Sequence, residues 1–362
     1  MKRFVLMFSL VLIHTFLCAQ ELVWFDPLMA EKEVVEGQGW SGIEFNRLPD
    51  DAKAQVREPV WGLSRNAAGL LIRFASDAAE VHVKFKPGSR LSMPHMPSTG
   101  VTGLDLYARD DRGSWRWVRG KYRFSPEEVS YTFVVPNATG IHREYQLYLP
   151  LYNSLSALKV GVMKDDTFAF MSKREAAPIV VYGTSIAQGA CASRPGMAWT
   201  NIVGRSLDVP MINLAFSGNG RLEPEVLDYV KQIDAAVFVL DCLPNLGPWG
   251  GFTEEVVKAK ILAAVRTLKA AHPKMPVLLV EHAGYSDGWM DPDRKSAYTN
   301  LNEWAASCFQ TLKDSGVKGL YLLSKEEMGL GNEDFVDGTH PTDLGMQHYA
   351  DAYIKKLKEI LQ

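Results

Sequence analysis

The sequence has no long apolar run beyond residue 20, few cysteines and no excess of basic charge. Beyond residue 20, no stretch is long and apolar enough to form a transmembrane helix, so we expect no integral membrane segment in the mature chain. The formal net charge of the 362 residues is −3 at pH 7, which gives no indication of a nucleic-acid partner. The composition therefore argues against an integral membrane protein and gives no support to a nucleic-acid-binding protein.

Cysteine is scarce and irregularly spaced. Only Cys191, Cys242 and Cys308 lie beyond the N-terminal segment, and their spacing is not that of a metal site. An odd number leaves two possibilities open: one disulfide with a free thiol, or three buried thiols. We expect neither a metal nor an organic cofactor.

Residues 1–19 have the layout of a secretory signal peptide. Two basic residues precede an apolar run from Phe4 to Phe16, which is too short to span a bilayer comfortably. Cleavage after Ala19 would release the mature chain. A lipid anchor on Cys18 is an alternative that the preceding leucine disfavours. We therefore expect an exported protein, periplasmic or secreted.

From residue 20 to residue 172 the pattern is a short alternation of apolar and polar residues. Val81, Val83 and Phe85 face one way and the polar residues between them face the other, which is typical of a half-buried strand. Similar runs, separated by turn-forming residues, occupy 70–74, 114–118, 131–135, 145–149 and 158–162. This half is predicted to form an all-β, jelly-roll-like sandwich domain.

From residue 173 to residue 362 apolar runs alternate with amphipathic helical stretches, which is the pattern of βαβ units. Strands are expected at 178–182, 210–215, 235–240, 277–280 and 320–323. Each is almost continuously apolar, as expected of parallel strands covered on both faces. The second half is therefore predicted to be an α/β domain with a flavodoxin-like, doubly wound parallel sheet, whose last helix begins at Thr342.

The segments after the first and fifth of these strands carry a possible catalytic triad. Ligands of open parallel sheets bind beyond the carboxyl ends of the strands. Ser185 follows the first strand, whereas Asp337 and His340 follow the fifth. An Asp three residues before a His can orient the imidazole, which then accepts the serine proton. Each segment alone could be an ordinary turn, but their joint placement favours a triad.

Two further segments could supply oxyanion donors. Gly218 lies after the second strand, in a glycine-rich loop that could equally be a simple tight turn. Asn245 follows the third strand, and its side-chain amide could donate to an oxyanion. Asp241, four residues earlier, could be a structural acceptor at the strand end.

His282 and Arg194 are candidates for contact with the substrate. His282 follows the fourth strand and is expected to line the cleft, although it could replace His340 as the base. Arg194 lies in the loop after Ser185, where it could contact substrate or anchor the loop through an ion pair.

These segments resemble the sequence blocks of SGNH (GDSL-like) hydrolases, in which serine, glycine, asparagine and D-x-x-H blocks follow in this order. The resemblance covers about half the chain. It implies that Ser185 is the nucleophile, that Asp337 and His340 complete the triad, and that Gly218 and Asn245 join the Ser185 N–H as oxyanion donors. Among the departures, a threonine precedes Ser185 where the family name has aspartate.

Gly103-Leu104-Asp105-Leu106-Tyr107 resembles the GxDLY signature of a β-sandwich domain that precedes SGNH esterase domains in bacterial exported proteins. Without that resemblance, the pentapeptide would be interpreted as an edge strand with a turn. The similarity to two-domain carbohydrate esterases implies an acetylated carbohydrate as substrate. A lipase or lysophospholipase remains an alternative, as does a non-catalytic glycan-binding protein of the cell envelope.

Overall fold

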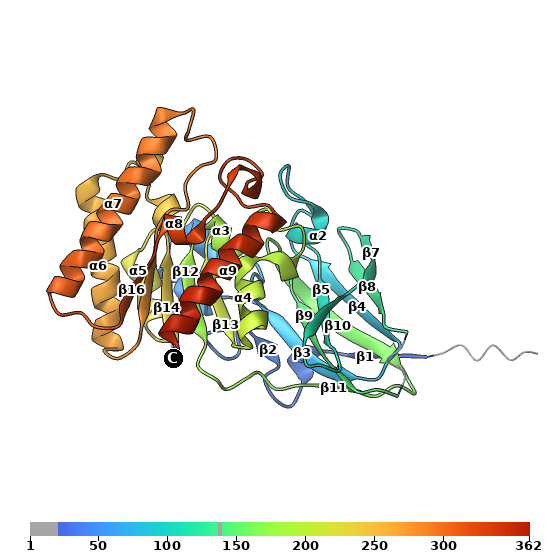
Figure 1. Ribbon diagram of the computed structural model, residues 1–362. Coiled ribbons are helices and arrows are strands. Elements are labelled where there is room, and N and C mark those ends of the chain that lie inside the picture. Colours follow the sequence, from blue (N-terminus) through green and yellow to red (C-terminus); the bar gives the residue numbers. More distant parts are fainter. Residues whose placement is uncertain (1–20, 137–139) are drawn as a thin grey trace, which may run out of the picture.

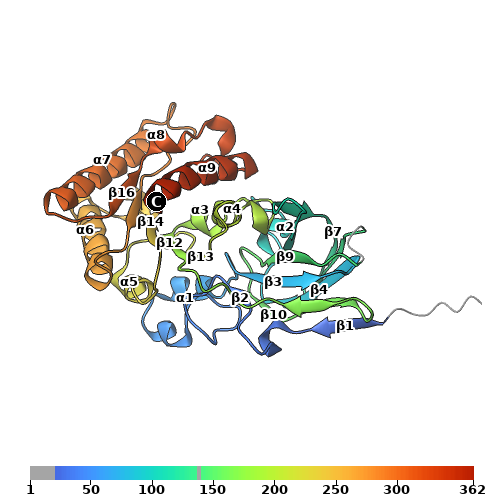
Figure 2. The same cartoon turned by 60° about the horizontal axis from the view of Figure 1, so that its bottom comes forward.

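The computed structural model describes residues 21–136 and 140–362 (Figure 1). The predicted signal peptide, residues 1–19, lies outside the described residues. No helix in the described part of the chain is long and apolar enough to cross a membrane. Figures 1 and 2 show the antiparallel sheets of the first half beside the parallel sheet and helices of the second half.

The first half contains two antiparallel sheets. One sheet has the strand order β1 (Leu22–Phe25), β10 (Leu155–Met163), β4 (Glu80–Pro87), β8 (Val129–Val134) and β7 (Gly120–Phe124). The other has the order β11 (Phe168–Phe170), β3 (Leu71–Ser76), β9 (Arg143–Tyr148), β5 (Asp105–Arg109) and β6 (Trp115–Val118), with β2 (Val35–Glu36) pairing to β3. The all-β prediction is confirmed.

Alternating side chains of the two sheets form one core. Val81, Val83 and Phe85 of β4 are at most 1% exposed and join the same apolar cluster as Tyr145 and Leu147 of β9. Packing of two inner faces in this way defines a sandwich. The pentapeptide at 103–107 does not form an edge strand, because β5 pairs with both β9 and β6.

The second half contains a five-stranded parallel sheet. Its order is β13 (Met211–Ala215), β12 (Ile179–Gly183), β14 (Val237–Asp241), β15 (Val277–Val280) and β16 (Leu320–Leu323). In chain order this is 2-1-3-4-5, the flavodoxin-like arrangement, so the predicted fold class is confirmed.

The described residues also form α-helices and short 3-10 helices. The α-helices are α1 (Glu58–Ser64), α2 (Ser98–Val101), α3 (Ser185–Gln188), α4 (Trp199–Leu207), α5 (Pro224–Val230), α6 (Glu254–Ala271), α7 (Pro292–Asp314), α8 (Lys325–Met328) and α9 (Asp343–Ile360). The short 3-10 helices are η1 (Pro27–Met29), η2 (Asp50–Ala54), η3 (Pro195–Met197), η4 (Leu243–Asn245), η5 (Pro248–Gly250) and η6 (Asn332–Asp334). Helices cover both faces of the parallel sheet. One apolar core cluster joins the sheet to α5, α6 and α7, and a second cluster joins it to α4 and α9.

Helix α9 follows the predicted pattern closely. The Thr342 hydroxyl accepts a hydrogen bond from the Gly345 N–H at 3.2 Å and caps the helix. The buried residues of α9 include Met346, Tyr349 and Tyr353, which recur at helical spacing and pack against the sheet. This cap fixes the start of α9 immediately after the turn that carries His340.

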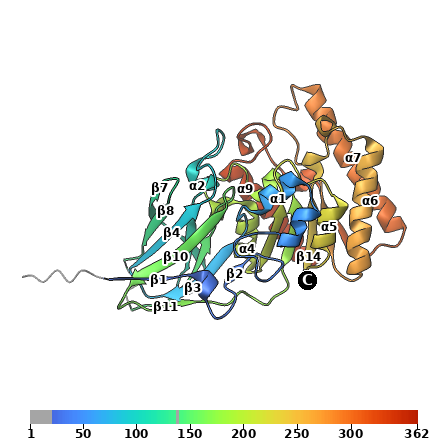
Figure 3. The same ribbon diagram turned by 180° about the vertical axis from the view of Figure 1, so that it is seen from behind.

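Part of the first half packs against the parallel sheet. Leu48 and Val60 belong to the apolar core of that sheet, and α1 lies beside α5 (Figures 2 and 3). Arg47 is 1% exposed and donates hydrogen bonds to the carbonyls of Asn213 and Ala215 on β13. The domain division at residue 172 stays a prediction, since residues before it complete the core of the second half.

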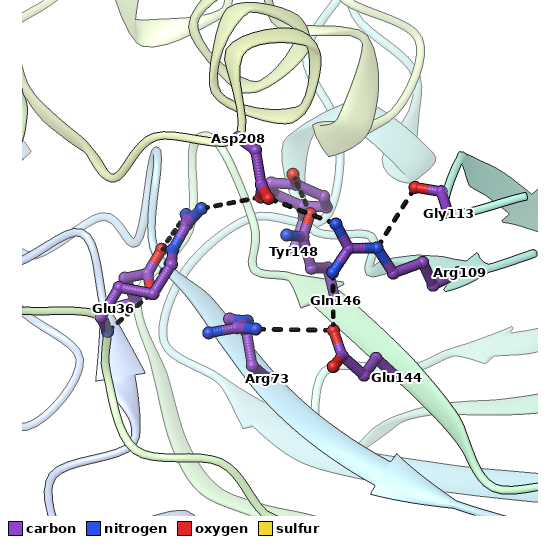
Figure 4. A network of polar contacts seen from close by, with 9 residues as sticks. Glu36, Arg73, Arg109, Gly113, Glu144, Gln146, Tyr148 and Asp208 are labelled. Carbon is purple, nitrogen blue, oxygen red and sulfur yellow. Dashed lines mark hydrogen bonds and ion pairs between the residues drawn. The ribbon is translucent and has the colours of Figure 1, made fainter. Parts of the chain in front are cut away.

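A network of charged side chains joins the two halves at a second place (Figure 4). Arg174, in the connecting segment, pairs with the buried carboxylate of Glu36 and with Asp208, which follows α4. Arg109 on β5 bridges Asp208 and Glu144 at 3.2 and 3.1 Å. Ion pairs of Arg174 therefore hold the connecting segment to both halves of the chain.

Candidate active site

Ser185 begins helix α3 directly after the carboxyl end of β12. Its side chain is almost buried, with the residue 7% exposed, and its hydroxyl oxygen lies 2.9 Å from His340 Nε2. The first N–H groups of a helix have no partner within the helix. The backbone at Ser185 can therefore donate to an anion that forms beside its own hydroxyl.

His340 is held by the carboxylate of Asp337. The Nδ1 atom lies 2.8 Å from Asp337 Oδ2, while Oδ1 accepts hydrogen bonds from the N–H groups of His340 and Thr339. Partial burial acts to raise the pKa of Asp337, but these hydrogen bonds outweigh it and leave the pKa below its usual value. The carboxylate therefore stays ionised and fixes the imidazole with Nε2 toward Ser185.

The loop containing Gly218 packs against the turn that carries Ser185. A Cβ at Gly220 would lie 2.1 Å from the Gly183 carbonyl oxygen, so only glycine permits this approach. Gly218 itself has a φ of +69°, a backbone conformation that favours glycine. Among the described residues, none accepts a hydrogen bond from the Gly218 N–H, which leaves this group available to a ligand.

Asn245 is joined to the same loop. Its Oδ1 accepts a hydrogen bond from the Gly220 N–H at 3.0 Å. This contact fixes the orientation of the amide, so that Nδ2 is the donor directed elsewhere. The structure thus brings together Ser185, Asp337 and His340, and it connects the loops of Gly218 and Asn245 to the same strand ends.

His282 does not lie on the wall of this site, as its position after β15 had led us to expect. It is 1% exposed, its Nδ1 accepts a hydrogen bond from the Gly284 N–H, and its ring packs against Tyr285 and Tyr298. Burial lowers the pKa of His282 to about 3, so the ring is neutral. The imidazole at the Ser185 hydroxyl belongs to His340 instead.

Arg194 anchors its loop, which is one of the two roles that the sequence left open. Its guanidinium pairs with the carboxylate of Asp105 and donates to the Tyr107 hydroxyl at 2.7 Å. Asp105 Oδ2 also accepts the Gly196 N–H at 2.9 Å. The Asp and Tyr of the GxDLY pentapeptide thus bind the loop that follows the nucleophile, across the boundary between the two halves.

Two supporting residues were missed by sequence reasoning. Arg294 on α7 donates to the Gly338 carbonyl and the Thr339 hydroxyl, and so holds the turn between Asp337 and His340. Asp343 accepts from the Ser193 N–H at 2.8 Å and ties the loop after α3 to the start of α9. Both are ordinary helix residues in the sequence, and no local pattern distinguishes them.

Asp241 and the three cysteines are buried. Asp241 is buried and accepts a hydrogen bond from the Tyr353 hydroxyl at 2.9 Å, and burial raises its pKa to about 6. Cys191, Cys242 and Cys308 are free, buried thiols. Of the two possibilities left by their odd number, three buried thiols is confirmed.

Two family models match the chain. The GDSL-like lipase/acylhydrolase family matches residues 176–358, and the N-terminus of SGNH-hydrolase-type esterases matches residues 22–168. The first match contains the candidate triad and the second contains the pentapeptide. No curated protein sequence matches the chain.

Solved structures are similar over almost the whole chain. A protein from Bacteroides ovatus ATCC 8483, described as a GDSL-like lipase, is 31% identical with a TM-score of 0.85, covering 94% of this chain and 98% of that one. A salicylyl-acyltransferase from a tetracycline biosynthetic pathway is 17% identical with a TM-score of 0.73, covering 95% and 98%. An acetyl xylan esterase from the rumen bacterium Butyrivibrio proteoclasticus is 11% identical with a TM-score of 0.55, covering 94% and 99%. The last two share the fold.

Proposed function

The chain belongs to the GDSL-like lipase/acylhydrolase family, and from this premise we propose that it is a serine esterase that removes short acyl groups, in particular O-acetyl groups, from carbohydrates. The observation that carries the proposal is the continuous chain of contacts from Ser185 Oγ to His340 Nε2 at 2.9 Å and from His340 Nδ1 to Asp337 at 2.8 Å. Serine is a weak nucleophile alone, and this arrangement supplies the base and its orienting carboxylate.

In the first half of the reaction, Ser185 Oγ attacks the ester carbonyl carbon while His340 Nε2 takes the hydroxyl proton. Negative charge develops on the former carbonyl oxygen. The N–H groups of Ser185 and Gly218 and the amide of Asn245 are the donors that would stabilise it. The tetrahedral intermediate then expels the sugar alkoxide, which takes the proton from His340 and leaves as the alcohol.

In the second half, water hydrolyses the acyl-Ser185 ester. His340 accepts a proton from the water as its oxygen attacks the acyl carbon, and then returns the proton to Ser185 Oγ as the carboxylic acid leaves. Asp337 stays ionised throughout and stabilises the imidazolium that forms twice in each cycle.

The proposed acetylated carbohydrate rests on architecture. The chain has the two-part organisation of carbohydrate esterases, and the acetyl xylan esterase described above shares its fold along 94% of the chain. The predicted signal peptide supports export to the compartment where polysaccharides are encountered. Direct sequencing of the N-terminus of the exported protein would test cleavage after Ala19.

Acetate release from a panel of acetylated plant and host glycans tests the proposal. The mature chain should release acetate from at least one of them, and a Ser185→Ala variant should not. Acetyl esters of an aryl alcohol should be hydrolysed faster than octanoyl esters. A preference for octanoyl esters would instead identify a lipase or lysophospholipase, and failure of a fluorophosphonate to label Ser185 would support a non-catalytic binding protein.

A further inference from the structure

Three side chains with metal-binding atoms meet beside Ser185. One nitrogen each of His95 and His340 and the sulfur of Cys191 lie within 4.8 Å of one another. The two imidazole ring centroids are 5.8 Å apart. The three residues come from separate segments: the loop between β4 and α2, the loop after α3, and the turn before α9.

The chemistry of this set suits a borderline or soft divalent cation. Zinc binds histidine nitrogen at about 2.0–2.1 Å and cysteine sulfur at about 2.3 Å in tetrahedral geometry, which places two nitrogens and one sulfur roughly 3.3–3.6 Å apart. From separations of up to 4.8 Å, the three atoms would therefore need to approach by at most about 1.5 Å. His95 is exposed, so rotation of its side chain can supply this movement. Three protein ligands leave a fourth position for water or the Ser185 hydroxyl.

The triad also provides the outer shell that a zinc-binding histidine normally has. Such a histidine donates its other ring N–H to a carboxylate, which fixes the tautomer and strengthens the ligand. His340 Nδ1 has this contact with Asp337 at 2.8 Å, and the lone pair of Nε2 is directed toward Ser185. The contact with Asp337 that orients His340 as a base thus orients it equally as a metal ligand.

The thiol of Cys191 is neutral in the absence of a bound cation. Burial, together with the negative charge of Asp337, raises the pKa of its thiol to about 12. A bound cation would displace the thiol proton to solvent, because the thiolate is the ligand form.

We propose that His95, Cys191 and His340 form a binding site for a divalent cation of the zinc class, and that the bound cation reversibly blocks ester hydrolysis. The block follows because the cation occupies the Nε2 lone pair that would accept the Ser185 proton. This inhibition rests on the proposed esterase function, whereas cation binding does not. Cation binding and hydrolysis are thus separate measurements.

Binding is tested directly on the mature chain carrying Ser185→Ala, which removes any turnover. Titration with Zn²⁺ in a calorimeter, in two buffers of different ionisation enthalpy, should show one site with release of a proton. Co²⁺ should produce the near-ultraviolet absorption of a cobalt–thiolate bond. Adding Cys191→Ser should abolish that absorption, and adding His95→Ala should weaken zinc binding at least tenfold. His142→Ala, at an exposed histidine of the sandwich, is the matched control and should change neither.

Inhibition is tested on the wild-type active site with an aryl acetate. Zn²⁺ should stop hydrolysis and a chelator should restore it, while Cys191→Ser and His95→Ala should each need at least ten times more Zn²⁺. The proposal is overturned by absence of zinc binding at micromolar concentration, by a cobalt complex without thiolate absorption, or by equal zinc sensitivity of wild type and both variants. If the wild-type chain hydrolyses no ester, the esterase function fails, and the calorimetric and cobalt measurements still decide the cation site.

Discussion

The carboxylate of Asp105, on an inner strand of the sandwich, pairs with Arg194 in the loop that follows the nucleophile helix. The Asp105 side chain is only 4% exposed, whereas Arg194 remains 26% exposed. The same carboxylate accepts hydrogen bonds from Trp117 Nε1 and the Gly196 N–H. The sandwich therefore contributes a buried carboxylate that holds the loop following the nucleophile helix.

Asp105→Asn is expected to destabilise the protein markedly. Removing one charge of a buried pair leaves the other uncompensated, which here should cost about 2–4 kcal/mol, below the full range for buried pairs because Arg194 is partly solvated. Denaturant unfolding measures this. Asp50→Asn is the control, since the Asp50 carboxylate is 95% exposed in its pair with Arg65 and should contribute at most about 1 kcal/mol. Equal effects of the two substitutions would argue against a structural role for the buried pair.

Ser185→Ala and Asp337→Asn should separate the nucleophile from its support. The first should remove turnover of an aryl acetate, on the order of 10⁶ in kcat, and the second should lower kcat by about 10⁴, because an amide cannot hold the correct imidazole tautomer. Turnover assays combined with fluorophosphonate labelling of Ser185 distinguish the two variants, since Asp337→Asn keeps the serine that is labelled. Substantial activity in Ser185→Ala would exclude the proposed mechanism.

Asn245 should act through its amide nitrogen. Asn245→Ala removes the donor and should lower kcat by about 10²–10³ with little change in KM. It also removes the acceptor for the Gly220 N–H. Asn245→Asp retains that acceptor, so it should preserve the melting temperature better than Asn245→Ala while its kcat is still low. A kcat equal to that of wild type in either variant would remove Asn245 from the oxyanion site.

His282 should make the protein less stable in acid. Its pKa is about 3 in the folded state, against 6.5 as its ordinary value, because the ring is buried. Between these values the unfolded chain binds the proton and the folded chain does not, so stability falls as pH decreases from 6.5 toward 3, by at most about 1.4 kcal/mol per pH unit. Chemical unfolding across this range measures the slope. His282→Gln, which lacks the titrating ring, should show a shallower slope than wild type.

Strand positions and the order of the candidate site residues could be predicted because both are local signals. β15 and β16 have the predicted bounds, and Ser185, Asp337 and His340 meet because parallel strands end at one edge. His282 has the same local signal, since it also follows a strand. Its burial depends on the rings of Tyr285 and Tyr298, which pack against it. The spacing of these residues along the sequence does not indicate this packing.

Contacts between distant segments were the part that could not be predicted. Arg194 has its partner on β5, and the cation ligands of the proposed site come from three segments with no common motif. The spacing of the cysteines along the chain carries no information about which side chains folding brings beside Cys191. Without the family resemblance, the residues of β5 would be interpreted as an edge strand for the same reason, since the second neighbour of β5 is fixed only by the complete sandwich.

The buried guanidinium of Arg47 has a consequence for aggregation. β13 is the outermost strand of the parallel sheet on its side, and Arg47 occupies the carbonyls of Asn213 and Ala215 that would otherwise be free to pair. Unprotected sheet edges recruit strands from other molecules. Residues 173–362 produced alone would lack Arg47 and its two hydrogen bonds to β13. The truncated chain is therefore expected to self-associate through β13, whereas the whole chain is not.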